Sequence, residues 1–287
     1  RFSILINRLL YPSKSTVQCR KRQGVHDEGI ALAGGRVGFY SVEPPGDTPP
    51  GRITLYANSD KETVMRKLKV GMIGGGGSGN FFGGVHKRCI SFDATRELVA
   101  GALRSDPTTA MDAAEEMGLI GFPDWRNMLD ACVNGDINLD YITIVTPNFA
   151  HYEPAKAFVE AGIPVLCEKP MTMTVEEAED LRDAVQRSGV PFVLAHTYTG
   201  HPMLMLAKSM IANGEIGDVR KIESWYTQGW LAGRLENDGV QQAEWRTDPK
   251  RAGISCCGGD IGTHAYVDAV WTTGIDVKRV SARLNTF

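Results

Sequence analysis

Short apolar runs alternate with amphipathic stretches between Lys67 and about residue 197, and this alternation limits the possible folds more than any other feature. The runs are nearly continuous, which is typical of parallel strands covered on both faces. They span 68–73, 98–103, 141–146, 164–167 and 192–195. Because helical patterns separate them, the sequence predicts βαβ units and a doubly wound parallel sheet over residues 65–197.

The clearest helical pattern covers residues 174–189. Thr174 and Glu177 have the spacing of a capping box, and Gly189 supplies a typical C-terminal stop. This helix lies between the last two predicted strands, as a crossover between parallel neighbours requires.

The pattern changes after about residue 197. We expect a helix at about 201–213, a second helix that begins near Gly259, and long strands at 219–230 and 276–287. Two strands without partners are marginally stable. Residues 198–287 are therefore predicted to be the first part of a truncated α+β substrate domain with a largely antiparallel, open sheet.

The first 64 residues differ in character from the remainder of the chain. Residues 1–25 are basic and contain no acid, which is typical of organellar transit peptides. Residues 42–51 have the Pro and Gly content of a linker. For residues 1–64 we favour a poorly ordered extension ahead of a true start at Met65. A targeting segment is the less favoured alternative.

Composition excludes several classes of function. A formal net charge of −3 and a pI near 6.1 argue against nucleic acid as a partner. No apolar run reaches the roughly 18 residues that a membrane span needs. The six cysteines lack metal-type spacing, and they favour a reducing compartment, hence a cytoplasmic location. The histidines are scattered, so we predict no metal site.

A glycine-rich loop comes directly after the first predicted strand. Its Gly74, Gly76 and Gly79 have the spacing of a dinucleotide-binding turn. Bare backbone lets a pyrophosphate approach, and the next helix offers free N–H groups to the anion. Many such loops are plain turns, but a strand before it and a helix after it favour a Rossmann-type cofactor site.

The second predicted strand ends in Leu103-Arg104-Ser105 rather than in an acid. Arg104 and Ser105 can bind a 2′-phosphate through charge and hydrogen bonds, which favours NADP over NAD. Arg104 can equally be a solvated loop residue, and Asp106 can still reach the ribose of NAD.

Three motifs occur in an order that resembles the Gfo/Idh/MocA oxidoreductases, a family that includes sugar and inositol dehydrogenases. They are "TPNFAH" at 146–151, "EKP" at 168–170 and "GGDIGTHAYVD" at 258–268. The resemblance covers about residues 67–287. "YTQGW" (226–230) and "EWRTDP" (244–249) are also similar to sugar dehydrogenases. The N-terminal extension has no counterpart there, and the family's substrate domain normally continues beyond residue 287.

The resemblance implies roles for two of these loops. Lys169 would bond the reactive hydroxyl and the cofactor ribose. We also count Glu168 among the cofactor-binding residues, where its charge could hold that region electrostatically. The first motif would lie against the cofactor through Thr146, Pro147, Asn148 and His151, and we expect Asn148 to cap a helix.

The position of Lys169 points in the same direction. It ends a predicted strand, and ligands of doubly wound sheets bind beyond the carboxyl ends of the strands. A solvated Glu–Lys pair is the alternative. Asp260 and His264 lie four residues apart, which places both on one face of a helix. An imidazole can take a proton from a secondary alcohol, and a carboxylate can orient it.

Four residues are candidates for the substrate pocket, since aromatic rings and a guanidinium suit a ring of hydroxyls. They are Tyr198, Trp230, Trp245 and Arg246. Core aromatics and a surface ion pair explain them equally well.

The resulting prediction is an NAD(P)-dependent oxidoreductase that transfers hydride between the cofactor and a secondary alcohol of a sugar, cyclitol or glycoside. A non-catalytic sensor of the same fold is the alternative. Retention of both Lys169 and His264 favours the enzyme. The expected partner is a small polyol, and the family resemblance implies a homo-oligomer when full length.

Overall fold

The computed structural model describes residues 66–77, 81–254 and 256–283, which all belong to one compact unit. The predicted extension over 1–64 lies outside the described residues, as does Gly79, the third glycine of the predicted loop.

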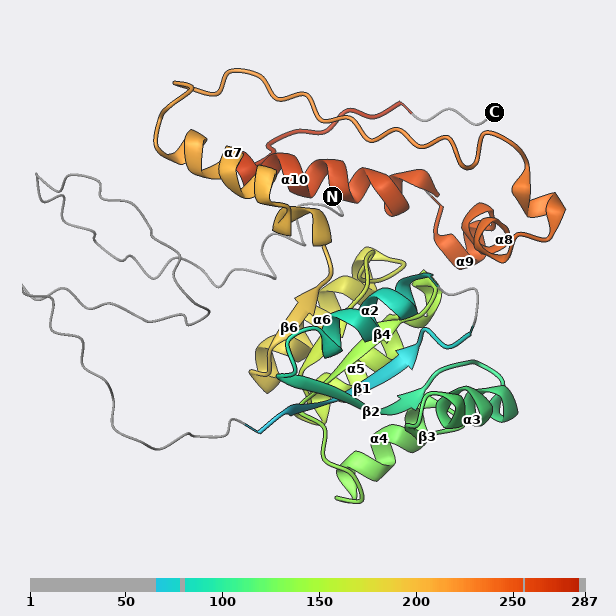
Figure 1. The fold of residues 1–287 in the computed structure, drawn as a ribbon. Helices are drawn as coiled ribbons and strands as arrows, with labels where there is room; N and C mark the ends of the chain where they lie inside the picture. The colour runs from blue at the N-terminus through green and yellow to red at the C-terminus, as the bar shows by residue number, and fades with distance from the viewer. Residues whose placement is uncertain (1–65, 78–80, 255, 284–287) are drawn as a thin grey trace, which may run out of the picture. The chain divides into compact units, whose positions relative to one another are not determined.

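The described residues contain a six-stranded parallel sheet with the order β3-β2-β1-β4-β5-β6 (Figure 1). The strands are β1 (Leu68–Gly74), β2 (Arg96–Ala102), β3 (Ile120–Gly121), β4 (Tyr141–Val145), β5 (Val165–Cys167) and β6 (Phe192–Leu194). This confirms the predicted doubly wound sheet, and five strands coincide with the predicted apolar runs. β3 was not predicted, because two residues carry no detectable pattern.

Apolar packing covers both faces of this sheet. Phe158 and Leu181 belong to a cluster that includes Ile73 of β1. Met72, the preceding residue on β1, packs instead with Ala114 on the opposite face. The covering helices are α2 (Phe81–Ser91), α3 (Pro107–Glu116), α4 (Trp125–Val133), α5 (Tyr152–Glu160) and α6 (Val175–Ser188). Continuous apolar strands are therefore explained by burial on two sides.

Helix α6 has the predicted ends. The Thr174 hydroxyl accepts from the Glu177 N–H, and the Glu177 carboxylate accepts from the Thr174 N–H in return. Gly189 comes next with a φ of 71°, in the left-handed region.

After β6, short helices replace the sheet. They are η2 (Thr197–Gly200), α7 (Pro202–Ala212), η3 (Leu235–Asp238), α8 (Gln241–Thr247), α9 (Pro249–Ala252), the π-helical turn η4 (Gly258–Gly262) and α10 (Thr263–Thr273). α7 packs along α10 (Figure 1). The helices expected at about 201–213 and from Gly259 are present.

The strand prediction was wrong for residues 219–230 and for the described part of 276–287. Both segments have no strand assignment in the structure. A strand needs a neighbouring strand whose backbone forms hydrogen bonds with its N–H and C=O groups. The apolar pattern that predicted these strands is present in the sequence. The described residues, however, provide no neighbouring strand to hydrogen-bond with either segment.

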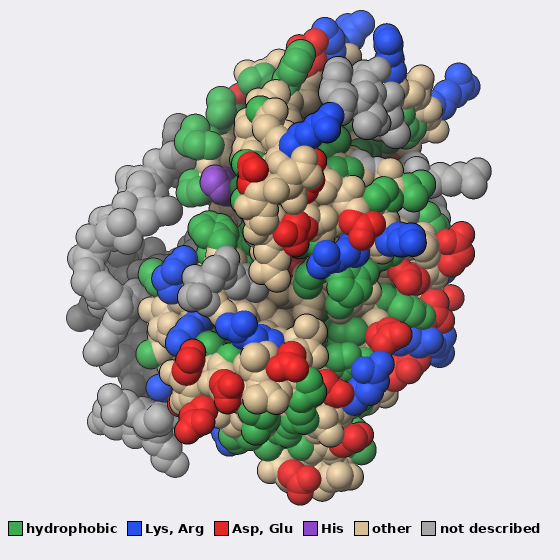
Figure 2. All heavy atoms as spheres, turned by 90° about the vertical axis from the view of Figure 1, so that its right-hand side faces the viewer, with side chains coloured by type: hydrophobic (Ala, Val, Ile, Leu, Met, Phe, Trp, Pro, Cys, Tyr) green, Lys and Arg blue, Asp and Glu red, His purple; other side chains and the backbone are tan. Residues whose placement is uncertain are grey.

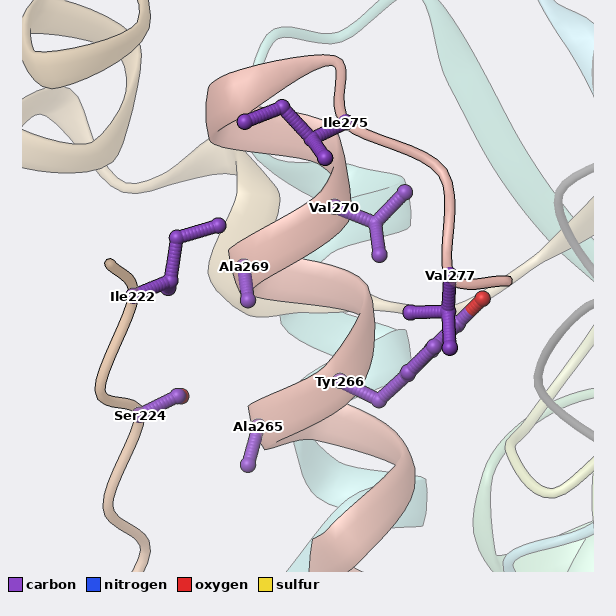
Figure 3. A pocket seen from close by; sticks show the side chains of 8 residues that line it. All are labelled: Ile222, Ser224, Ala265, Tyr266, Ala269, Val270, Ile275 and Val277. Carbon is purple, nitrogen blue, oxygen red and sulfur yellow. The ribbon is translucent and has the colours of Figure 1, made fainter. Parts of the chain in front are cut away.

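An apolar hollow of about 330 Å³ lies against α10. Figure 3 shows that Ala265 and Ala269 face the segment of Ile222, while Val277 lies beside the helix on the segment after it. Most of its lining is aliphatic, so this hollow does not have the polar groups of a catalytic site.

Charges are mixed on the face shown in Figure 2, where acidic and basic side chains are interspersed. This distribution fits the formal net charge of −3. Within the described ranges, no helix has the length and apolar character needed to cross a membrane.

Candidate active site

The candidate site lies at the carboxyl edge of the sheet, where the strand order reverses between β1 and β4. Such a switch point leaves a crevice for ligands in doubly wound sheets. Gly74 ends β1, Thr146 follows β4, Lys169 follows β5 and His196 follows β6 closely. The sheet thus directs four separate chain segments toward one edge.

The described part of the glycine loop, residues 74–77, has the close backbone packing that a pyrophosphate cradle needs. Gly74 has a φ of 75°, which turns the chain sharply after β1. A Cβ on Gly83 would lie 2.0 Å from the carbonyl oxygen of Gly75, so α2 approaches the loop as closely as two backbones allow. A Cβ on Gly76 would lie 2.6 Å from Leu103. The loop therefore fits a dinucleotide. Gly83 was not predicted, although the Gly83-Gly84 doublet was visible in the sequence.

The end of β2 lies beside this loop. A Cβ on Gly77 would lie 2.7 Å from a guanidinium nitrogen of Arg104. Arg104 and Ser105 are exposed. Asp106 caps α3 by accepting from the Thr109 N–H at 2.9 Å, and hydrogen bonds from Thr109 lower the pKa of Asp106. The Arg104 guanidinium therefore lies against the glycine loop, whereas the Asp106 carboxylate accepts a hydrogen bond from the start of α3.

The loop after β4 is tied to two other segments. His151 is fully buried, with Nδ1 2.7 Å from the Pro170 carbonyl oxygen and Nε2 2.8 Å from that of Thr146. Burial lowers the pKa of His151. Asn148 begins the short helix η1 (Asn148–Ala150) without capping it, because Pro147 is the N-cap and the Asn148 amide donates to the Ala252 carbonyl at 3.2 Å. The expected cap is therefore wrong.

Lys169 is the centre of the site. Its amine donates to the Asp260 carboxylate at 2.7 Å and to the Asp260 carbonyl at 2.9 Å. The Lys169 side chain is only 11% exposed, and that of Asp260 19%. Arg246 Nε donates to the other Asp260 oxygen at 3.3 Å. Burial opposes ionisation of Asp260, but Lys169 and then Arg246 outweigh it and hold its pKa below the usual range.

His264 lies on α10, one turn beyond Asp260, in a cluster of rings. Its ring centroid lies 4.5 Å from that of Tyr198, 5.6 Å from that of His196 and 5.9 Å from that of Tyr226. Its Nδ1 is buried without a partner among the described residues. Burial, and then the charge of Lys169, lower the pKa of His264 to about 4. The His264 ring is therefore neutral near pH 7, and it lies close enough to the Lys169 amine for that charge to lower its pKa.

Two members of this ring cluster were not among the predicted site residues, although Tyr226 begins the YTQGW motif. Tyr226 lies with its hydroxyl 2.6 Å from that of Tyr198, and this hydrogen bond, followed by burial, raises the pKa of Tyr198 to about 12. His196 is buried with both ring nitrogens unpaired among the described residues. Its signal was position, since it follows β6 closely, as Lys169 follows β5.

Three of the four predicted substrate residues lie together. The Arg246 guanidinium carbon lies 4.1 Å from the ring centroid of Trp245 and 5.6 Å from that of Trp230. Arg246 also contacts Asp260, so this group adjoins Lys169. Tyr198 adjoins the site through its ring contact with His264.

The Glu168 carboxylate is held against α2. Its Oε1 lies 2.8 Å from Nε2 of His86, and its Oε2 accepts from the Lys169 N–H at 3.3 Å. His86 in turn lies 2.8 Å from the Thr143 hydroxyl through Nδ1. His86 and Thr143 were not predicted, because neither stands in a recognisable motif.

Comparison with known proteins shows the family to which the chain belongs. Among curated proteins, the uncharacterized oxidoreductase YfiI of Bacillus subtilis is 32% identical over 208 residues, which cover 71% of this chain and 52% of that protein. Levoglucosan dehydrogenase of Pseudarthrobacter phenanthrenivorans is 32% identical over 236 residues, covering 78% and 55% respectively. The chain thus spans about half the length of these curated relatives.

Solved structures and family models agree with these relatives. A structure of an inositol dehydrogenase homologue from Azotobacter vinelandii with NAD+ matches with a TM-score of 0.68 and 30% identity, covering 72% of this chain and 54% of that one. The model of an oxidoreductase family with an NAD-binding Rossmann fold matches residues 68–196. The model of the Gfo/Idh/MocA C-terminal domain matches residues 204–287. The chain belongs to the Gfo/Idh/MocA family of oxidoreductases.

Proposed function

We propose that the protein is an NAD(P)-dependent dehydrogenase or reductase that acts on a secondary alcohol of a sugar, cyclitol or glycoside. The observation that carries this proposal is the meeting of Lys169 and Asp260, which lie 91 residues apart in sequence, at 2.7 Å. That contact brings the amine at the end of β5 next to the helix that carries His264. The relatives named for levoglucosan and inositol dehydrogenation support the substrate class.

The residues divide the chemistry between them. His264 is proposed to accept the hydroxyl proton, which requires a neutral ring, and its pKa of about 4 leaves the ring unprotonated near neutrality. Lys169 donates a hydrogen bond to the same oxygen and stabilises the negative charge that develops there. Asp260 holds Lys169 in place. A bound nicotinamide supplies the hydride acceptor. The alcohol thus loses a proton and a hydride and becomes a ketone.

The polyol would lie between the Lys169–Asp260 pair and the aromatic groups. Trp230, Trp245 and Arg246 are proposed to contact its ring and hydroxyls on one side, and Tyr198 on the other. Their contacts with one another, with Asp260 and with His264 support this arrangement. Neutral rings and one guanidinium suit an uncharged polyol.

The cofactor would be bound by the glycine loop (Gly74, Gly76 and, outside the described residues, Gly79) and by Thr146, Pro147 and Asn148. We infer that NADP is favoured over NAD, because Arg104 lies over the loop while Asp106 caps α3. His151 and Glu168 were predicted to contact the cofactor. Their polar atoms bind other parts of the protein, so we propose that they support the loops instead.

Three broader expectations stay predictions. They are a division into a dinucleotide-binding domain at 65–197 and a substrate domain at 198–287, a cytoplasmic location, and a homo-oligomer of the full-length protein.

A turnover screen tests the proposal. Inositols, glucose, glycosides and anhydrosugars are incubated with each nicotinamide cofactor, and cofactor reduction is followed. We expect turnover of at least one polyol, and a loss of about 10²-fold or more in Lys169→Ala and in His264→Ala. Cofactor binding without turnover of any polyol would favour the non-catalytic sensor. Unchanged turnover in both variants would remove the two assignments.

A further inference from the structure

A buried hydrogen-bonded chain runs behind the candidate site, from β4 through α2 to the end of β5. Thr143, His86 and Glu168 form it, with 2.8 Å between each neighbouring pair of polar atoms. Their exposed fractions are 0%, 8% and 9%. Glu168 extends the chain by one contact, because its second oxygen accepts from the Lys169 N–H.

The position of His86 on its helix explains why its side chain points inward. The buried residues of α2 are Gly83, His86 and Ile90, which recur at helical spacing and form one face against the sheet. Gly83 brings this face against the glycine loop. His86 is therefore fixed by the same packing that forms the proposed pyrophosphate cradle.

His86 satisfies a carboxylate that would otherwise be costly to bury. A buried charge needs a close partner and hydrogen bonds. Nε2 of His86 donates to one Glu168 oxygen and the Lys169 N–H donates to the other. With both oxygens engaged, Glu168 stays turned toward α2. The amine of the adjacent Lys169 is thus left to Asp260.

We propose that His86 is a positioning residue for Lys169. By holding Glu168 against α2, it keeps that carboxylate from competing with Asp260 for the Lys169 amine, and it couples the helix after the glycine loop to the amine at the end of β5. The catalytic consequence rests on the proposed function. The effect on the amine itself does not.

The test uses variants of His86 that differ in reach. Glutamine places its amide nitrogen near the Nε2 position and can still donate to Glu168. Asparagine reaches only the Nδ1 position, toward Thr143, and leucine reaches neither polar partner. His86→Gln and His86→Asn are therefore a matched pair that separates the contact with Glu168 from the contact with Thr143.

Two measurements are made on each variant. The first is kcat and KM with a polyol that the wild type turns over, alongside the dissociation constant of the reduced cofactor. The second is acetylation of Lys169 by an amine-reactive ester, followed by peptide mass spectrometry, which needs no activity. A role in general stability alone would lower the melting temperature and leave both measurements unchanged.

We expect His86→Asn and His86→Leu to lower kcat by about tenfold to 10²-fold, since small misplacements of a reacting group have effects of this size. The cofactor dissociation constant should change by less than about threefold, whereas the acetylation rate of Lys169 should change by more than about threefold. His86→Gln should keep kcat within about threefold of the wild type. Adding Glu168→Gln to His86→Leu should restore part of the loss, because the competing charge is gone.

The outcomes separate this proposal from the proposed function. Wild-type kcat and Lys169 acetylation in both His86→Asn and His86→Leu, with activity abolished in Lys169→Ala, would overturn the role of His86 and leave the enzyme. If no polyol is turned over by the wild type, the proposed function fails and acetylation alone decides the role of His86. If His86→Leu does not fold, the matched pair of His86→Gln and His86→Asn decides it.

Discussion

At the scale of single residues, Asp260 connects the parts of the candidate site. Its two carboxylate oxygens bind Lys169 and Arg246, and it lies one turn before His264. Sequence spacing had suggested Asp260 as a partner of His264. The structure adds that two cations hold this carboxylate, which ties the proposed catalytic amine to the aromatic group around Arg246.

Removing that charge should affect both activity and stability. We expect Asp260→Asn to lower kcat by about 10²-fold, because Lys169 loses its anchor. The free energy of unfolding should fall by about 3 kcal/mol, since two poorly solvated cations lose their partner. Steady-state kinetics and urea unfolding measure the two effects, with the exposed Asp238→Asn as control. Equal behaviour of the two variants would contradict the role assigned to Asp260.

The two buried histidines predict how stability changes with pH. Burial, followed by like charges, lowers the pKa of both His196 and His264 to about 4. Between about pH 4 and the ordinary value of about 6.5, the unfolded chain therefore binds more protons than the folded protein. Stability from this source is present above pH 6.5 and is lost as the pH falls toward 4.

This pH dependence can be assigned by mutation. Each histidine contributes at most about 1.4 kcal/mol per pH unit within that window. Urea unfolding of His196→Leu at several pH values should show a slope reduced by up to one such contribution. An unchanged slope would show that His196 titrates normally in the folded protein.

Arg104 provides a residue-scale test of cofactor preference. If its guanidinium binds a 2′-phosphate, Arg104→Ala should weaken NADPH binding by about tenfold or more and leave NADH binding nearly unchanged. Fluorescence titration with both cofactors measures this, and Arg88→Ala on α2 is the control. Tighter binding of NADH than of NADPH by the wild type would reverse the inferred preference.

At the scale of elements, local patterns predicted the sheet and its helices well. The apolar runs found five of the six strands, and Thr174, Glu177 and Gly189 fixed both ends of α6. These features depend on neighbours in sequence. β3 and the extended segments depend on partners distant in sequence, which is why two-residue β3 was missed and residues 219–230 were wrongly predicted as a strand.

Helix α2 allows a matched test of the glycine loop. A Cβ on Gly83 would lie 2.0 Å from the Gly75 carbonyl oxygen, whereas on Gly84 the nearest contact is with Arg88 at 3.6 Å. Alanine raises helix propensity equally at both positions. Overpacking costs about 1–3 kcal/mol, so Gly83→Ala should weaken cofactor binding by about tenfold or more and Gly84→Ala should not. Equal dissociation constants in the two variants would contradict the role of this close approach.

At the scale of the whole molecule, the candidate site depends on contacts that sequence patterns could not supply. Lys169 and His264 were predicted separately, one from the end of a strand and one from helical spacing combined with the family resemblance. The contact between Lys169 and Asp260, which lies one turn before His264, requires the part after β6 to fold back over the sheet edge. His196, Tyr226 and the chain through His86 arise from the same tertiary packing.

The proposed chemistry is tested most sharply by a crystal structure with a nicotinamide cofactor and a polyol that the enzyme turns over. We predict that the Lys169 amine and a ring nitrogen of His264 both lie about 3 Å from one hydroxyl oxygen, with its carbon facing the nicotinamide. A complex in which the two groups face different cavities, or in which the polyol contacts neither, would contradict the proposed roles of both residues.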